Sequence, residues 1–190
     1  MEQMKPTPDP ELIQRTLEGD RQAFEALVDR YKHMVYTLAV RMLRNREVAE
    51  EAAQDTFLKA YKGLETYQGG ARFSTWLYKI AYHNCLDRLK KMSRRPSTTP
   101  LEYQRYDGRE TGGIEEGLEY EDKKRSIRMA IERLSEKDAA LISMFYYDEL
   151  SIAEISVISD LSPENIKIRL YRSRKQLASD LRPFMEAQKL

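Results

Sequence analysis

The sequence has little cysteine and little histidine, and this scarcity excludes several kinds of site. Cys85 is the only cysteine among 190 residues, so an internal disulfide cannot form. His33 and His83 are the only histidines, and together with one thiol they give no zinc-ligand spacing. A cysteine on the apolar side of a helix is usually inert, so we expect Cys85 to serve packing. We expect neither a metal ion nor a cofactor.

Long hydrophobic runs are also missing. No stretch approaches the roughly 18 to 20 apolar residues that a membrane helix needs, and the start, MEQMKPTPDPE, lacks the pattern of a secretory signal. Charged residues make up 33% of the chain, while aromatics at 9% and aliphatic residues still suffice for small cores. We therefore expect a cytoplasmic protein that is soluble and mostly folded.

Sustained strand alternation is absent too, whereas the helical period recurs in nearly every extended segment. We therefore predict an all-α fold. The expected helices cover residues 9–17, 21–43, 47–64, about 71–91, about 127–134, 135–146, 152–158 and 163 onward. A chain of 190 residues suits two small helical domains of roughly 70 to 90 residues each.

The boundary between the two domains is predicted from composition and charge. Residues 93–117 contain two prolines, four glycines and no clear apolar period. The expected organisation is a first domain at 9–95, a flexible acidic linker at 96–118 and a second domain at 119–185. The net charge of +1 averages over blocks, because basic segments at 69–95 and 163–190 flank the acidic connector. This pattern is typical of a protein with two nucleic-acid contacts.

The first basic segment, ARFSTWLYKIAYHNCLDRLKK, interleaves aromatic side chains with cations. The aromatics are Phe73, Trp76, Tyr78 and Tyr82. Such a surface suits stacking of unpaired bases and binding of their phosphates. In a helix, Trp76, Lys79 and His83 would share one side, and the apolar residues another. The alternative is that these aromatics form core, as aromatics at helical spacing usually do.

The second basic segment has the layout of a helix-turn-helix. Ser151 and Glu154 form a capping box for a short helix, and Ser162 followed by Pro163 opens a long basic helix. Asp160 lies in the turn, where aspartate tolerates a left-handed backbone. The apolar side of the last helix can bury against the short one, which leaves its cations free for the major groove. The alternative is a helix face that is merely solvated.

Three stretches in this order and spacing resemble the sigma factors of bacterial RNA polymerase, and more closely their extracytoplasmic-function group. The stretches are AEEAAQDTFLKAYKGLETY, RFSTWLYKIAYHNCLDRLKK and LSIAEISVISDLSPENIKIRLYRSRKQL. The resemblance implies a sigma-2-like helical bundle before the linker and a sigma-4-like helix-turn-helix domain after it. It also implies a transcription initiation factor with three partners: core RNA polymerase, at its β′ coiled coil and β flap, promoter DNA, and an anti-sigma factor.

The resemblance also implies roles for particular residues. The polymerase contacts would be Glu51, Gln54, Asp55 and Leu58. A captured minus-ten base would be surrounded by Gly63, Tyr67, Ile80 and His83, and the aromatic and basic helix adds Phe73, Trp76 and Lys79. The minus-35 element would meet Lys167, Ile168, Tyr171 and Arg172, with Arg169 and Arg174 nearby. Tyr67 and His83 stand where a familiar member has phenylalanine and asparagine, so base choice at minus ten stays open.

Two other classes of function remain to be weighed. One is a helix-turn-helix regulator whose N-terminal domain dimerises or senses a ligand without joining polymerase. The other is an enzyme acting on nucleic acid. The chain offers no phosphate-binding loop, no metal-ligand cluster and no nucleophile paired with histidine in a familiar motif, so we do not expect an enzyme.

Overall fold

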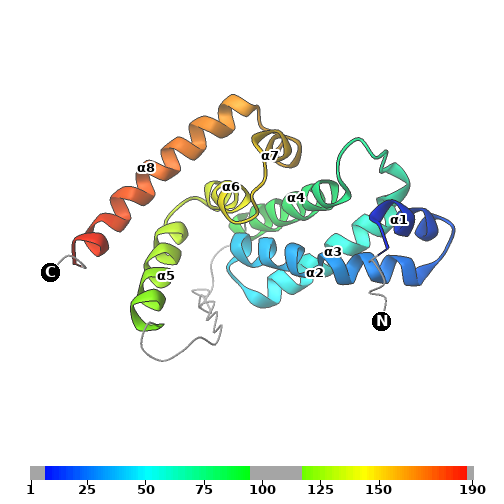
Figure 1. Cartoon of the computed structure of the whole chain (residues 1–190), viewed down its shortest axis with the longest axis horizontal. Helices are drawn as coiled ribbons and strands as arrows, with labels where there is room; N and C mark the ends of the chain where they lie inside the picture. The colour runs from blue at the N-terminus through cyan, green and yellow to red at the C-terminus, as the bar shows by residue number, and fades with distance from the viewer. Residues whose placement is uncertain (1–6, 95–116, 188–190) are drawn as a thin grey trace, which may run out of the picture. The chain divides into compact units, whose positions relative to one another are not determined.

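The computed structural model describes residues 7–94 and 117–187, and within these residues every regular element is helical (Figure 1). The elements are α1 (Asp9–Leu17), α2 (Arg21–Leu43), α3 (Arg46–Gly63), the 3-10 turn η1 (Leu64–Thr66), α4 (Phe73–Arg94), α5 (Gly117–Glu132), α6 (Glu136–Tyr146), α7 (Ile152–Ser159) and α8 (Pro163–Ala187). The chain divides into two compact units, one containing α1 to α4 and the other α5 to α8. The predicted all-α fold is confirmed. The predicted linker lies outside the described residues, apart from the start of α5.

Capping residues set the helix boundaries of the first unit. The Asp20 carboxylate accepts from the backbone N–H groups of Gln22 and Ala23, which starts α2. Asn45 caps α3 by accepting from the N–H of Val48, so this helix begins at Arg46, one residue before the predicted start. Between α2 and α3, Arg44 is left-handed with φ 53° and ends the longer helix.

The core of the first unit lies where α2, α3 and α4 pack against one another. Its centre contains fully buried side chains at helical spacing: Leu27, Val35, Leu38 and Met42 from α2, the small residues Ala49, Ala52 and Ala60 from α3, and Leu77, Ala81 and Cys85 from α4. Alanines on α3 allow the neighbouring helix backbones to approach closely. Helix α1 packs against α2 and also against η1.

The second unit packs α8 against α5, α6 and α7. Ile155 and Ile158 of α7 and Ile166 and Leu170 of α8 are buried, as the sequence pattern predicted. Both hydrogen bonds of the predicted capping box form between Ser151 and Glu154. These bonds fix the start of α7, the short helix that precedes α8.

In the described part of the chain, no helix is both long enough and apolar enough to cross a bilayer. Among the same residues, no three potential metal ligands come together.

Candidate functional site

The outer face of α3 presents a stripe of mixed polarity. Glu51, Gln54 and Leu58 are exposed, Leu58 by 59%, and Asp55 is half-buried beside them. Their spacing of three and four residues places all four side chains on one face of the helix. The inner face is held by small side chains such as Ala52 and Ala60, so α3 sits close to the core and keeps this stripe outside. The residues predicted to contact polymerase therefore share one surface.

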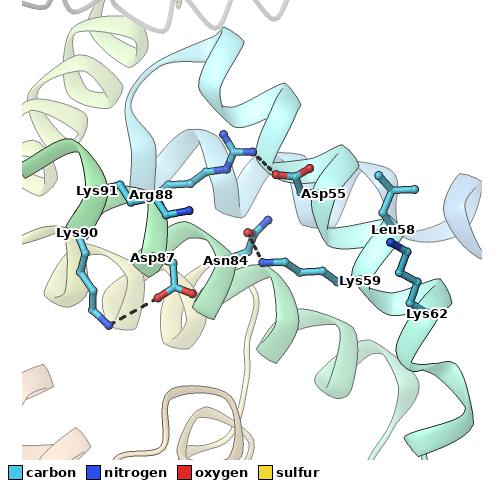
Figure 2. Close-up of a pocket in the computed structure, with 9 residues that line it drawn as sticks. All are labelled: Asp55, Leu58, Lys59, Lys62, Asn84, Asp87, Arg88, Lys90 and Lys91. Carbon is cyan, nitrogen blue, oxygen red and sulfur yellow. Dashed lines mark hydrogen bonds and ion pairs between the residues drawn. The ribbon is translucent and has the colours of Figure 1, made fainter. Parts of the chain in front are cut away.

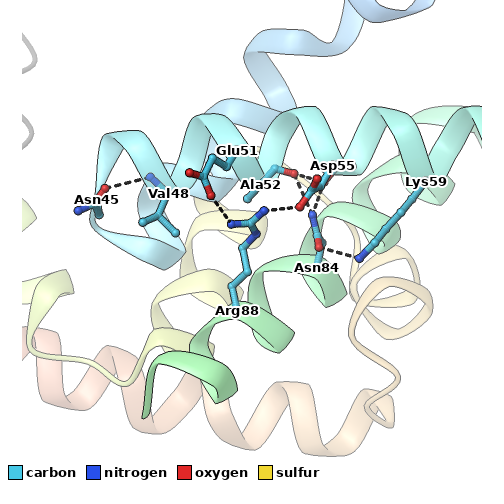
Figure 3. A network of polar contacts seen from close by, with 9 residues as sticks. Asn45, Val48, Glu51, Ala52, Asp55, Lys59, Asn84 and Arg88 are labelled. Carbon is cyan, nitrogen blue, oxygen red and sulfur yellow. Dashed lines mark hydrogen bonds and ion pairs between the residues drawn. The ribbon is translucent and has the colours of Figure 1, made fainter. Parts of the chain in front are cut away.

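Arg88 of α4 reaches across to two of these residues (Figure 3). Its Nη1 donates to Glu51 Oε2 at 3.0 Å, and its Nη2 donates to Asp55 Oδ2. Although partial burial works against the charged form, these two carboxylates raise the pKa of Arg88. A guanidinium that donates to two carboxylates fixes both of them in direction. The acidic part of the α3 stripe is therefore oriented by α4.

A second polar link between α3 and α4 is buried (Figure 3). The Asn84 amide nitrogen donates to the Ala52 carbonyl oxygen at 2.9 Å and to Thr56 Oγ1 at 3.2 Å. The Asn84 amide oxygen accepts from Lys59 Nζ at 2.7 Å. A buried amide whose donors and acceptor are used fixes the register of the two helices, since any shift would leave a polar group unpaired.

An open groove of about 600 Å³ lies beside this link, between α3 and α4 (Figure 2). Its walls are Asp55, Leu58, Lys59, Lys62, Asn84, Asp87, Arg88, Lys90 and Lys91. Five of these nine side chains are cationic and two are acidic, so the groove favours anionic groups.

Four aromatic rings form a cluster at the start of α4. The Phe73 ring lies 5.6 Å from the rings of Tyr31 and Trp76 and 5.7 Å from that of Tyr67. Tyr67 and Trp76 also contact each other, with ring centroids 5.4 Å apart. Tyr67 is held from the loop side, because its hydroxyl donates to the Ala71 carbonyl oxygen at 2.7 Å. Tyr67 and Trp76 are half-buried, so the cluster is open on one side.

The structure separates the aromatics of α4 into two groups. Phe73 and Tyr78 are each 3% exposed and Tyr82 is 2% exposed, whereas Trp76 is half-buried. The sequence allowed two interpretations of the four aromatics of α4, base stacking or core packing. For Tyr78 and Tyr82 the structure supports core packing, because both residues are buried. Phe73 lies beneath Tyr67 and Trp76 and presents no face to solvent. The cause is that α4 packs against both α2 and α3, so the buried arc of the helix is wide enough to include all three rings.

The other residues predicted for minus-ten capture lie on α4 after Trp76 and at the end of α3. Lys79, Ile80 and His83 follow Trp76 along α4 and are half-buried. Gly63 ends α3, and a Cβ atom there would lie 3.9 Å from the Trp76 ring. A larger side chain at this position would therefore project toward Trp76.

The second unit presents the exposed face of α8. Lys167, Ile168, Tyr171, Arg172 and Arg174 are exposed, and Tyr171 by 62%. The turn that precedes α8 contains Asp160 with φ 56°, in the predicted left-handed conformation. Five of the six residues predicted for the minus-35 contact thus lie in solvent.

Arg169 is the sixth, and its side chain lies against α6. Its Nε donates to Asp138 Oδ1 at 2.7 Å. Asp138 also accepts from the Ser135 hydroxyl at 2.6 Å, at the start of α6. Although burial alone would raise it, the contacts with Arg169 and Ser135 hold the pKa of Asp138 below its ordinary value. Arg169 ties α8 to α6.

Sequence reasoning missed the contacts made by Asn84, Arg88 and Asp9. Asn84 and Arg88 follow Leu77 and Ala81 at helical spacing, so their place in the apolar register was a usable signal for buried polar contacts. For Asp9, the only signal in the sequence was its position at the start of a short helix. Its carboxylate accepts from Arg30 and from the Tyr31 hydroxyl of α2, and no local pattern announces such a pairing.

Two family models match the chain: Sigma-70 region 2 over residues 27–95 and Sigma-70, region 4, over residues 124–177. The ECF RNA polymerase sigma factor SigW of Bacillus subtilis is 33% identical over 186 residues, with 90% of this chain and 95% of that protein covered. The ECF RNA polymerase sigma-E factor of Escherichia coli K12 is 30% identical, with 93% and 96% covered.

Two solved structures share the fold. CnrH in complex with the cytosolic domain of CnrY has a TM-score of 0.66 at 19% identity and covers 92% of this chain and 97% of its own. The sigma factor RpoE from Bartonella quintana, in complex with the anti-sigma factor NepR, has a TM-score of 0.63 at 18% identity, with 84% and 96% covered. At these identities the likeness concerns the arrangement of the helices.

Proposed function

The chain belongs to the extracytoplasmic-function group of sigma-70 factors, and from this membership we propose how its two units share the work of promoter recognition. As a sigma factor it binds core RNA polymerase and directs transcription initiation, and it is not an enzyme. The first unit binds core and captures the minus-ten element. The second unit reads the minus-35 element. The observation that carries this division is that the first unit exposes the α3 stripe and the open side of the aromatic cluster, whereas the second unit exposes one face of α8.

The α3 stripe is the proposed contact with core polymerase. Glu51 and Asp55 supply negative charge held in place by Arg88, and Leu58 supplies exposed apolar surface next to them. Apolar area flanked by oriented charges is typical of a specific protein interface. We assign this stripe to the β′ coiled coil, and the second unit to the β flap.

The aromatic cluster is the proposed site of minus-ten capture. Trp76 and Tyr67 are half-buried on a floor formed by Phe73, so a flipped base could stack without rearranging the core. Each stacked base contributes about 1 to 3 kcal/mol, which is comparable with the few kcal/mol needed to unstack it from a duplex. Strand opening would thus be driven by binding energy, without nucleotide hydrolysis. Phe73 acts by supporting the other rings.

The exposed face of α8 is the proposed minus-35 reader. Lys167, Ile168, Tyr171 and Arg172 occupy the first turns of α8, which are the part of a recognition helix that reaches base edges. Arg174 lies further along, where side chains more often hold phosphates. Arg169 supports this face from behind through Asp138.

Regulation and location follow from the same membership. One structural neighbour is a sigma factor held by an anti-sigma factor, and we propose such a partner for this chain as well. Because core polymerase acts on the chromosome, we place the protein in the cytoplasm.

A test of the proposed function needs only the purified chain, core polymerase and a randomised promoter library. We expect a pull-down to retain core, and run-off transcription to select promoters that share a minus-ten and a minus-35 element. A chain that binds duplex DNA but fails to retain core would be a helix-turn-helix regulator. That result would overturn the proposal.

A further inference from the structure

Asp9, the first residue of α1, joins this helix to α2 through two side chains. Its carboxylate accepts from the Arg30 guanidinium and from the Tyr31 hydroxyl. Arg30 also donates to the Thr7 carbonyl oxygen at 2.6 Å. The Asp9 side chain is only 22% exposed, so these contacts are less screened by water than a surface ion pair. Asp9 belongs to none of the surfaces assigned so far.

Tyr31 connects Asp9 to the aromatic cluster. The Tyr31 ring lies 5.6 Å from the Phe73 ring, at an interplanar angle of 57°. Phe73 in turn contacts both Tyr67 and Trp76. Ring contacts of this kind have preferred geometries, so the orientation of one ring constrains the next. The hydroxyl of Tyr31 is therefore held at one end of a continuous series of contacts whose other end is the proposed base-stacking surface.

A second route links α1 to the same surface. Helix α1 packs against η1, the turn that leads directly into Tyr67. Burial and, after it, the negative charge of Asp9 raise the pKa of Tyr67. The Asp9 carboxylate is thus close enough to influence the cluster from this side too.

We infer that Asp9 is a positioning residue for minus-ten capture, which acts by fixing Tyr31 and thereby the orientation of Phe73, Tyr67 and Trp76. The inference rests on the proposed function, because only that function places these rings at the promoter strand. The competing explanation is that Asp9 merely anchors α1 through its ion pair with Arg30. The two explanations differ in whether the Tyr31 hydroxyl or the Arg30 charge matters.

Three variants separate these explanations. Asp9→Ala removes both contacts, and Tyr31→Phe removes only the hydroxyl and keeps the ring. Arg30→Met removes the ion pair and the hydrogen bond to the Thr7 carbonyl oxygen, and it keeps the Tyr31 contact. Trp76 is the only tryptophan of the chain, so its fluorescence reports directly on the cluster in the free protein. The second readout is the affinity of the holoenzyme for the non-template minus-ten strand of a promoter recovered by the run-off selection. Thermal unfolding followed by circular dichroism checks that each variant is folded.

We expect Asp9→Ala and Tyr31→Phe to shift the emission of Trp76 and to weaken strand binding by about tenfold, the loss that one charge-assisted hydrogen bond can account for. Arg30→Met should leave both readouts within about twofold of the parent chain, because the Tyr31 hydroxyl still donates to Asp9 and its ring still contacts Phe73. Equal effects of all three variants, or an effect of Arg30→Met alone, would show that Asp9 only anchors α1. Unchanged Trp76 emission in Tyr31→Phe would also overturn the inference.

The emission measurement does not depend on polymerase. If the parent chain fails to retain core, the proposed function fails while the coupling between Asp9 and Trp76 can still be measured. If the parent chain transcribes but Tyr31→Phe binds the strand normally, the inference fails and the proposed function stands. Should Asp9→Ala not fold, Tyr31→Phe alone decides, since it deletes a single oxygen atom.

Discussion

Helices α4 and α8 have similar compositions, but they bury different kinds of side chain. Both mix aromatic side chains with lysines and arginines. In α4, three of the four aromatics are buried and Arg88 turns toward α3. In α8, Tyr171 and Arg172 are exposed and the buried positions are held by Ile166, Leu170 and Ser173.

Composition therefore predicts contact with nucleic acid only when the helical register is considered as well. Helix α4 packs against both α2 and α3, so most of its circumference is interior. The aromatic surface of α4 that is left for nucleic acid is therefore Trp76. Helix α8 buries one stripe and leaves the rest of its first turns in solvent.

The largest expected effect comes from truncating a buried ring of α4. Phe73→Ala should destabilise the first unit by about 3 to 5 kcal/mol, because it removes the floor of the aromatic cluster and leaves a cavity. The matched variant Tyr171→Ala should change stability by less than about 0.5 kcal/mol, because the ring is exposed. Denaturant unfolding followed by Trp76 fluorescence and circular dichroism measures both. Similar effects of the two variants would remove the contrast between the helices.

Arg88 of α4 and Arg172 of α8 should differ in their effect on the affinity for core polymerase. Asp55→Asn should weaken core binding by about tenfold if this carboxylate meets polymerase. Arg88→Gln should weaken it by a smaller factor, because the carboxylate stays but loses the guanidinium that orients it. When core affinity is measured, Arg88→Gln should have little further effect once both Glu51→Gln and Asp55→Asn are present, because the two carboxylates that it orients are then gone. Independent effects would mean that Arg88 contacts polymerase by itself. Arg172→Gln is the control on α8, and it should leave core affinity unchanged.

Within α8, pH should distinguish Arg169 from Arg172. The Asp138 pKa is lowered from 3.8 in the folded unit, so the stabilisation by Arg169 is present above that value and is lost as pH falls through the folded pKa. We expect acidification below about pH 4 to remove up to about 1 kcal/mol from the second unit, an upper figure for a partly exposed pair. Asp138→Asn and Arg169→Met should flatten this dependence, and Arg172→Met should not. A pH profile unaffected by Asp138→Asn would contradict the pairing.

The smallest expected effect concerns the thiol of α4. Burial raises the pKa of Cys85 to about 12, so the native protein should react slowly with a thiol reagent between pH 7 and 9. Tyr171→Cys, made in a Cys85→Ala background, places a thiol on the exposed face of α8 and should react rapidly. The rates of labelling with and without denaturant measure the contrast. Fast labelling of native Cys85 would show that the interior of α4 opens readily.

Much of the fold was predictable because it depends on local signals. The helices at Asp9–Leu17 and Arg21–Leu43 have the predicted bounds, and the capping box of Ser151 with Glu154 forms as expected. The start of α3 differed by one residue because Asn45 supplies the cap. The resemblance to sigma factors depends on sequence motifs, and relatives that cover at least 90% of this chain support it.

The contacts between helices could not be predicted from the sequence. Nothing local distinguishes Arg169, which turns to Asp138, from Arg172, which remains in solvent. Tyr78 and Tyr82 resemble Trp76 in composition, and only packing against α2 and α3 shows that they are interior. Pairings such as Asp9 with Tyr31 join residues 22 positions apart, so they depend on how α1 meets α2.

The most direct test of the central claim, that the two units read different promoter elements, is permanganate footprinting of the open complex. The measurement uses holoenzymes made with the parent chain, with Trp76→Ala and with Arg172→Ala on a selected promoter. We predict that Trp76→Ala abolishes permanganate-reactive thymines around minus ten while core binding is retained. Arg172→Ala should reduce only occupancy of promoters that depend on the minus-35 element, with normal opening once bound. Normal opening by a folded, core-binding Trp76→Ala chain would contradict the account.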